Sequence, residues 1–113
     1  MAIQQCTFCD IVTGSIPARV RHEEDDIFVF DNQLDWTPTM LLLIPKAHLT
    51  QSELWQSGDL LGKIGALAVK MGSRLCPNGY RILSNVGHDA MQTQDHGHIH
   101  VIGGAHLGLY VRR

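Results

Sequence analysis

The alternation of apolar and polar positions along the chain predicts a short helix, one long helix and several strands. The stretch "CTFCDIVTGSIPA" is typical of a short helix or turn that ends at Gly14, and Pro17 prevents its continuation. From Gly58 to about Cys76, apolar residues recur every three or four positions and form one stripe, as in an amphipathic helix. Ser57 precedes this long helix and is a suitable N-cap.

Extended segments lie on both sides of the long helix. "VRHEEDD" and "IFVFD" are predicted to be strands that meet at an acidic turn, and "TMLLLIP" is a continuously apolar run, as in a strand covered on both faces. "YRILSNVG" and "HGHIHVIGG" follow the helix as two further extended segments. Strands around a single long helix predict an α+β domain with a mostly antiparallel sheet of about five strands. A length of 113 residues favours a single domain spanning residues 1–113.

Composition narrows the class of protein. The chain is 44% hydrophobic and 18% charged, as in a globular protein rather than a disordered one. A formal net charge of −2 disfavours binding to the backbone of a nucleic acid, which calls for a basic surface. No secretory leader and no apolar run long enough to cross a membrane is visible in the sequence. We therefore expect a cytoplasmic protein with reduced thiols and with neither nucleic acid nor membrane as a partner.

The stretch "QDHGHIHVIGG" places histidine at alternate positions. In an extended strand, residues two apart lie roughly 6.6 Å from each other on the same face. His96, His98 and His100 would share one face, while Ile99 and Val101 would lie on the opposite face and be buried. Because unpartnered imidazoles are costly to bury, a strand with one apolar face and one imidazole face indicates a functional site.

Three interpretations of these imidazoles remain open from the residues alone. The histidines could lie on a solvent-facing strand without a function. They could bind a zinc ion that keeps an open water position. Alternatively, one neutral imidazole could attack an electrophile, usually phosphorus, while neighbouring donors hold the oxyanions.

Cys6 and Cys9 form a C-x-x-C pair, and two thiolates at this spacing can reach one zinc ion. Closure of a tetrahedral site requires two further ligands, which His48 and one end histidine of the triplet, His96, could provide. In that case too few imidazoles remain for a catalytic zinc site, and the other two are available for covalent chemistry.

The segment "DHGHIHVI" resembles the signature of the histidine triad (HIT) family, in which three histidines alternate with apolar residues. The resemblance extends over nearly the whole chain, through "CTFCDIVTGSIPARVRHEEDDIFVFD", "PTMLLLIPKAHL" and "GYRILSNVG". It implies a HIT-like fold, with an antiparallel sheet, one long helix and a short N-terminal helix, assembled as a homodimer. It also implies a purine nucleotide substrate and the hydrolysis or transfer of nucleoside monophosphate groups, with phosphoramidates among the substrates.

The resemblance further implies roles for individual residues. His98 matches the nucleophile that becomes nucleotidylated, and His100 matches the histidine that contacts the phosphate and whose carbonyl orients the nucleophile. Asp31 matches the acidic residue that binds the ribose hydroxyls, and Asn85 matches a residue that contacts the phosphate or the sugar. Thr93 stands where a hydroxyl lies near the phosphate and the leaving group.

Four residues, Cys6, Cys9, His48 and His96, match the structural zinc ligands of one branch of the family. A structural zinc ion is therefore expected, with no metal or other cofactor in the chemical step.

Local structural roles remain open for some of these residues. Asp31 could cap the loop after its strand, and Asn85 could be a turn residue. Trp36 and Trp55 are expected to pack rather than to bind a base.

The chain also departs from the family pattern at several positions. Gly97 replaces an apolar residue and permits a close approach of another element, while Met40 and Asp95 together suggest a changed leaving-group pocket. Two other functions therefore stay open: a nucleotide-binding regulatory module with little catalytic activity, and a hydrolase with zinc held by the three triplet histidines.

Overall fold

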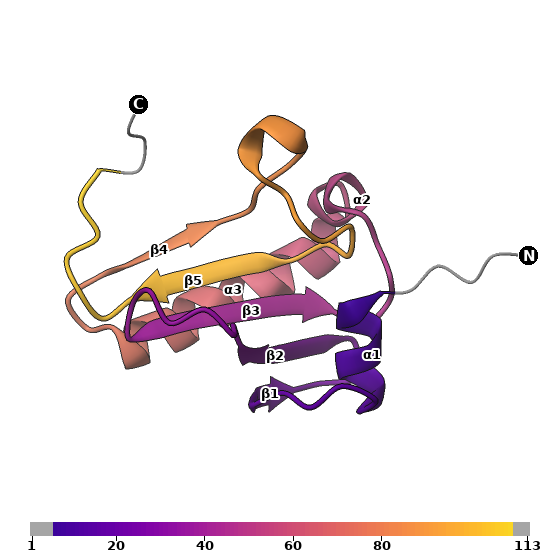
Figure 1. Ribbon diagram of the computed structural model, residues 1–113, viewed down its shortest axis with the longest axis horizontal. Coiled ribbons are helices and arrows are strands. Elements are labelled where there is room, and N and C mark those ends of the chain that lie inside the picture. The colour runs from indigo at the N-terminus through magenta and orange to yellow at the C-terminus, as the bar shows by residue number, and fades with distance from the viewer. Residues whose placement is uncertain (1–5, 110–113) are drawn as a thin grey trace, which may run out of the picture.

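The computed structural model describes residues 6–109 and shows one five-stranded antiparallel sheet with helices on both faces (Figure 1). The strand order is β1-β2-β3-β5-β4, and every neighbouring pair is antiparallel. The strands are β1 (Val20–Glu23), β2 (Ile27–Asp31), β3 (Thr39–Pro45), β4 (Tyr80–Leu83) and β5 (Ile99–Gly103). This arrangement confirms the predicted α+β class.

One face of the sheet is covered along its length by the long helix α3 (Gly58–Leu75) (Figure 1). The helix buries its apolar stripe, including Ile64, Ala68 and Met71, against alternate residues of the central strands. The sheet residues in this core are Ile27, Val29, Leu41, Leu43, Ile99 and Val101. The predicted long helix and its buried stripe are therefore confirmed.

The opposite face is covered at one end only, by the short helix α1 (Thr7–Thr13) (Figure 1). Phe8 and Ile11 of this helix pack on the residues of β2 and β3 that alternate with those under α3. Gly14 ends the helix in the left-handed conformation, with φ of 88°, as the sequence predicts. A helix of seven residues leaves the rest of this face uncovered.

A second short helix, α2 (Gln51–Trp55), follows β3 where no helix was predicted. Its signal is a capping box: the Thr50 hydroxyl accepts from the Glu53 amide, and the Glu53 carboxylate accepts from the Thr50 amide. Ser57 is the N-cap residue of α3, as predicted, but its hydroxyl donates to the Glu53 carbonyl at 2.6 Å and makes no capping hydrogen bond.

The last two strands are shorter than predicted. β4 ends at Leu83, and β5 begins only at Ile99, so His98 precedes the strand and His96 takes part in an isolated bridge with Thr50. Between them lies a short 3₁₀ helix, η1 (His88–Ala90). The segment with η1 loops outward between the end of β4 and α2 (Figure 1).

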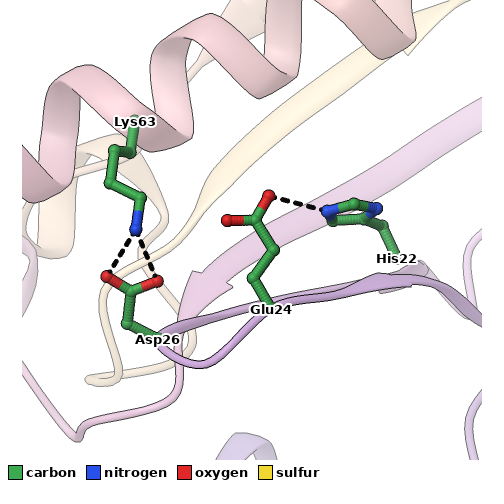
Figure 2. A network of polar contacts seen from close by, with 4 residues as sticks. All are labelled: His22, Glu24, Asp26 and Lys63. Atoms are coloured by element: carbon green, nitrogen blue, oxygen red, sulfur yellow. Dashed lines mark hydrogen bonds and ion pairs between the residues drawn. The ribbon is translucent and has the colours of Figure 1, made fainter.

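An exposed ion pair joins α3 to the turn between β1 and β2. The Lys63 ammonium donates to both Asp26 carboxylate oxygens at 2.9 Å, and beside it His22 contacts Glu24 at 2.8 Å (Figure 2). Lys63 holds the pKa of the Asp26 carboxyl below its usual value. In the part of the chain that is described, no helix is both long and apolar enough to span a membrane.

Candidate active site and metal centre

The uncovered face of the sheet carries a groove of about 700 Å³, which is within the usual size range of small-molecule sites. Its walls come from α1, from the loop between β2 and β3, and from the segment between β4 and β5. All five residues that the sequence predicted to act on substrate line this groove: Asp31, Asn85, Thr93, His98 and His100.

Strand pairing explains why imidazoles reach the groove floor. On β5, His100 pairs with Leu42 of β3 and with Leu83 of β4, and these three residues line the groove. Ile99 and Val101 alternate with His100 and lie in the core under α3. The predicted division of this strand into an apolar face and an imidazole face is confirmed.

His98 is only 3% exposed and is held in one tautomer. Its Nδ1 lies 2.7 Å from the His96 carbonyl oxygen, so Nδ1 carries the proton and donates. The acceptor is the carbonyl of His96, whereas the resemblance implied that of His100. This hydrogen bond leaves the lone pair on Nε2.

The backbone of His98 is fixed by two residues that the sequence analysis missed. Its amide donates to the Gln51 side-chain oxygen at 2.9 Å, and its carbonyl accepts from the Ser84 hydroxyl at 2.6 Å. Gln51 is 2% exposed and also donates to the Asn85 carbonyl at 3.1 Å. The Thr50–Glu53 capping box could have revealed the helix that brings Gln51 to this position.

Both groove imidazoles favour the neutral form. Burial lowers the pKa of His98. Burial, together with repulsion from a charge on His98, lowers the pKa of His100 to about 4. The two rings lie 5.0 Å apart between centroids. At neutral pH, His98 can therefore offer a lone pair, and neutral His100 retains one N–H donor.

Asp31 lies at the end of β2, where its carboxylate is already paired. Arg21 donates to both of its oxygens, at 2.8 and 3.2 Å, and Arg19 lies 3.6 Å away. The sequence did not predict this pairing, because the arginines belong to the neighbouring strand and the segment before it. A carboxylate has about four acceptor positions, so Asp31 can still accept further hydrogen bonds.

Two apolar side chains at the groove rim are exposed. Trp36 is 78% exposed and lines the groove, so the expectation that it packs rather than binds a base was wrong about its packing. Met91 lines the groove from the η1 side and has a positive φ of 62°, a conformation that is strained for a residue other than glycine.

The predicted metal ligands come together at the N-terminal end of α1. The ligand atoms of Cys6, Cys9, His48 and His96 all lie within 4.8 Å of one another. His96 Nδ1 is 3.4 Å from Cys6 Sγ and 3.5 Å from Cys9 Sγ, and His48 Nδ1 is 3.5 Å from Cys9 Sγ. Tetrahedral zinc with ordinary Zn–S and Zn–N bonds gives sulfur–nitrogen edges of roughly 3.5 Å. The cluster could therefore bind a metal ion.

Electrostatics and the second nitrogen of His96 also fit a metal. Burial and the neighbouring Cys6 sulfur raise the pKa of the Cys9 thiol to about 11. Both thiols would therefore lose their protons at neutral pH only with a cation beside the sulfur atoms. His96 Nε2 donates to the Pro45 carbonyl at 2.7 Å, which leaves the Nδ1 lone pair directed at the sulfur atoms.

The three triplet histidines do not form a metal site of their own. Among the described residues, the cluster above is the only group of histidine, cysteine or acidic ligands with suitable spacing. His96 belongs to the sulfur cluster, and the Nδ1 of His98 is used by a carbonyl. This geometry disfavours a hydrolase that holds zinc with the triplet.

Comparison with known families settles the classification. The HIT domain model matches residues 13–107, which is most of the chain. The chain belongs to the HIT family. The predicted resemblance is confirmed, together with the HIT-like fold.

HIT relatives are similar over almost the full length. A HIT-like protein of Azospirillum brasilense is 35% identical over 116 aligned positions, covering 94% of this chain and 91% of the relative. A HIT family hydrolase of Clostridium thermocellum superposes with a TM-score of 0.87 at 27% identity, covering 98% of this chain and all of that one. A HIT family hydrolase of Legionella pneumophila gives a TM-score of 0.84 at 34% identity, covering 91% and 96%.

Proposed function

We propose that this HIT protein is a hydrolase or transferase of nucleoside monophosphate groups that acts through a covalent intermediate on His98. The observation that carries the proposal is the 2.7 Å hydrogen bond from His98 Nδ1 to the His96 carbonyl, in a buried ring that lines the groove. It gives the imidazole a defined nucleophilic nitrogen, Nε2. Two solved relatives, the HIT family hydrolases of Clostridium thermocellum and Legionella pneumophila, support the reaction class.

The proposed reaction proceeds in two displacements. The lone pair of His98 Nε2 forms a bond to phosphorus while the bond from phosphorus to the leaving amine breaks, and the amine takes up a proton from solvent. Water then attacks phosphorus and releases one proton to solvent, the nitrogen–phosphorus bond breaks, and His98 regains its neutral state as the nucleoside monophosphate is released. Neutral His100, Asn85 and Thr93 supply donors to the phosphate oxygens during both steps.

The proposed substrate is a purine nucleoside phosphoramidate or a related nucleotidyl compound. Apolar residues at the α1 end of the groove, among them Phe8, Ile11 and Phe30, suit a flat base. Asp31 lies at the groove edge and is proposed to accept from the ribose hydroxyls while Arg21 holds its carboxylate in place.

The variant His98→Ala tests the covalent mechanism. Turnover of an adenosine phosphoramidate, measured as released AMP, should fall by at least ~10⁴-fold, because no other group replaces the nucleophile. Folding and AMP binding should change little. His88→Ala is the matched control, because His88 is fully exposed and does not line the groove. Hydrolysis retained in His98→Ala would remove the covalent mechanism.

A nucleotide-binding regulatory module is the second candidate. The loop beside the groove contains the strained Met91 and departs from the family pattern at Asp95. A loop that differs in this way can keep nucleotide binding and lose catalysis. Fluorescence separates the two functions. In a Trp55→Phe variant, the remaining Trp36 lines the groove and should report AMP binding, whereas in Trp36→Phe the remaining Trp55 should not. Binding without AMP release from a phosphoramidate would favour the regulatory module.

We also propose that the metal of the cysteine–histidine cluster is a structural zinc ion that takes no part in the chemical step. Cys6→Ser should lose zinc and stability together, because the metal binds only the folded arrangement of ligands. Elemental analysis and denaturant unfolding measure the two quantities. Zinc retained at full stoichiometry in Cys6→Ser would contradict this assignment.

Assembly as a homodimer is proposed through the edge strand β4 and helix α3. β4 is the last strand in the sheet order, and apolar Ile82 and Val69 are exposed on these two elements. Ile82→Arg should shift the protein from dimer to monomer in analytical ultracentrifugation. A monomeric wild-type protein at micromolar concentration would contradict the proposal.

A further inference from the structure

Phe8 lies between the metal centre and the His98 imidazole. In sequence it stands between the two cysteine ligands, in the first turn of α1, and it is 6% exposed. Its ring contacts that of His98 edge-on, with centroids 5.2 Å apart and an interplanar angle of 89°. It also contacts His96 at 5.9 Å and 66°. One aromatic ring therefore packs against both a metal ligand and the groove imidazole.

The position of Phe8 depends on the ligands on either side of it. Cys6 is the N-cap of α1, and its sulfur accepts from the Cys9 amide at 3.4 Å, so the two ligands define the first turn of the helix. The helix has only seven residues and would be marginal without tertiary support. A metal that joins Cys6 and Cys9 to histidines from other segments fixes this turn, and with it the backbone of Phe8.

A second connection to His98 runs through the main chain of His96. This residue directs Nδ1 at the cysteine sulfurs, donates from Nε2 to Pro45, and accepts from His98 Nδ1 on its carbonyl. The orientation of the His96 residue is therefore shared by the metal cluster and by the hydrogen bond that sets the His98 tautomer. Edge-to-face packing by Phe8 holds the same ring from its side.

We propose that Phe8 is a positioning residue through which the metal centre holds His98 in one rotamer and one tautomer. This inference rests on the proposed nucleophilic role of His98 and extends it, because it gives the neighbouring cysteine–histidine cluster an effect on the geometry of the nucleophile. With the ligand turn fixed, the Phe8 ring restrains the imidazole and Nδ1 stays on the His96 carbonyl. With the ring removed, the imidazole gains a second orientation and the proton distributes over both nitrogens.

The test compares Phe8→Leu with Phe28→Leu. Phe28 is a buried phenylalanine of the same apolar cluster and does not line the groove, so it controls for a lost ring in this core. The measurements on the zinc-loaded proteins are metal stoichiometry, the imidazole ¹⁵N shifts of His98, and kcat and KM for an adenosine phosphoramidate. Phe8→Leu should keep zinc and show a mixture of His98 tautomers. Its kcat should be ~10- to 100-fold lower, a larger change than the rise in KM that the altered groove wall causes. Phe28→Leu should match the wild type in all of these measurements, and Phe8→Tyr should restore a single tautomer.

The outcomes distinguish this proposal from the proposed function. Wild-type His98 shifts in Phe8→Leu would overturn the positioning role, and the shifts remain decisive even if the wild type has no turnover. If Phe8→Leu does not fold, the comparison moves to the wild type with and without zinc. A mixture of His98 tautomers after chelation would support the coupling, and an unchanged single tautomer would overturn it.

Discussion

The two faces of the sheet differ in chemistry: one packs in an apolar core, and the other carries the imidazoles of the groove. Under α3, Val29, Leu43 and Val101 are completely buried in an apolar core. On the other face, their neighbours His98 and His100 lie at the floor of a groove with Asn85 at its wall. Strand alternation separates the two environments by one residue, so stability and chemistry can be altered independently.

The difference between the faces arises from helix length. α3 has 18 residues and follows the sheet from end to end, whereas α1 has seven and covers one end only. The short helix leaves room for a ligand, and its support comes from the cysteine–histidine cluster at its N-terminus. A short helix on a small core, with a cluster at its N-terminus that could bind a metal ion, thus stands where a second long helix would close this face.

The largest expected effect on stability comes from breaking the apolar face. Leu43→Ala should lower the free energy of unfolding by about 2–5 kcal/mol, because it leaves a cavity at a fully buried position. The rate per folded molecule should stay close to wild type. Denaturant unfolding and active-site titration measure the two quantities. On the groove face, Thr93→Val should lower kcat, while its free energy of unfolding should stay within about 0.5 kcal/mol of the wild type.

A smaller effect that reaches both faces is expected at Gly97. A Cβ here would lie 2.9 Å from Leu54 Cβ and 3.0 Å from the Thr50 carbonyl, so α2 would have to move. Gly97→Ala should therefore cost about 1–3 kcal/mol of stability and also lower kcat, because α2 carries the Gln51 that holds His98.

Gly65→Ala in α3 is the matched control for Gly97→Ala. Nothing lies within 4 Å of its added Cβ, and the change should stabilise the helix by up to about 1 kcal/mol. If Gly97→Ala were as stable and active as the wild type, the close approach of α2 would have no consequence for the site.

A pH-dependent effect on stability is expected at His100. Its pKa is lowered by burial to about 4, below the ordinary value of 6.5, so the unfolded chain binds a proton more readily. Its contribution to stability is present above the ordinary pKa and is lost as pH falls from about 6.5 towards 4. His100→Gln should flatten this part of the stability curve, measured by urea unfolding between pH 7 and 4.5. Both proteins carry the same metal ligands, so an identical slope would contradict the assignment.

Much of the architecture could be predicted because its signals are local. The helical stripe of α3, the Gly14 cap and the alternation around His98 each depend on residues close in sequence. The metal cluster required a long-range inference, which the spacing of Cys6 and Cys9 and the family resemblance made possible.

The missed features depend on contacts between distant segments. Gln51 accepts a hydrogen bond from the His98 amide, 47 positions away in sequence, and Arg21 on the neighbouring strand donates to the Asp31 carboxylate. The exposure of Trp36 depends on how far α1 and the neighbouring loop extend over the sheet. The positive φ of Met91 follows from the path of the η1 loop, because methionine itself disfavours that conformation.

The central claim is that His98 Nε2 forms a bond to phosphorus. The most direct test is to mix the zinc-loaded protein with an excess of adenosine phosphoramidate, stop the reaction within the first turnover at alkaline pH, and map the modification by mass spectrometry. The account predicts one AMP group on His98, absent from His98→Ala, and net retention of configuration at phosphorus over the complete reaction. Turnover with no adduct and with inversion at phosphorus would contradict it.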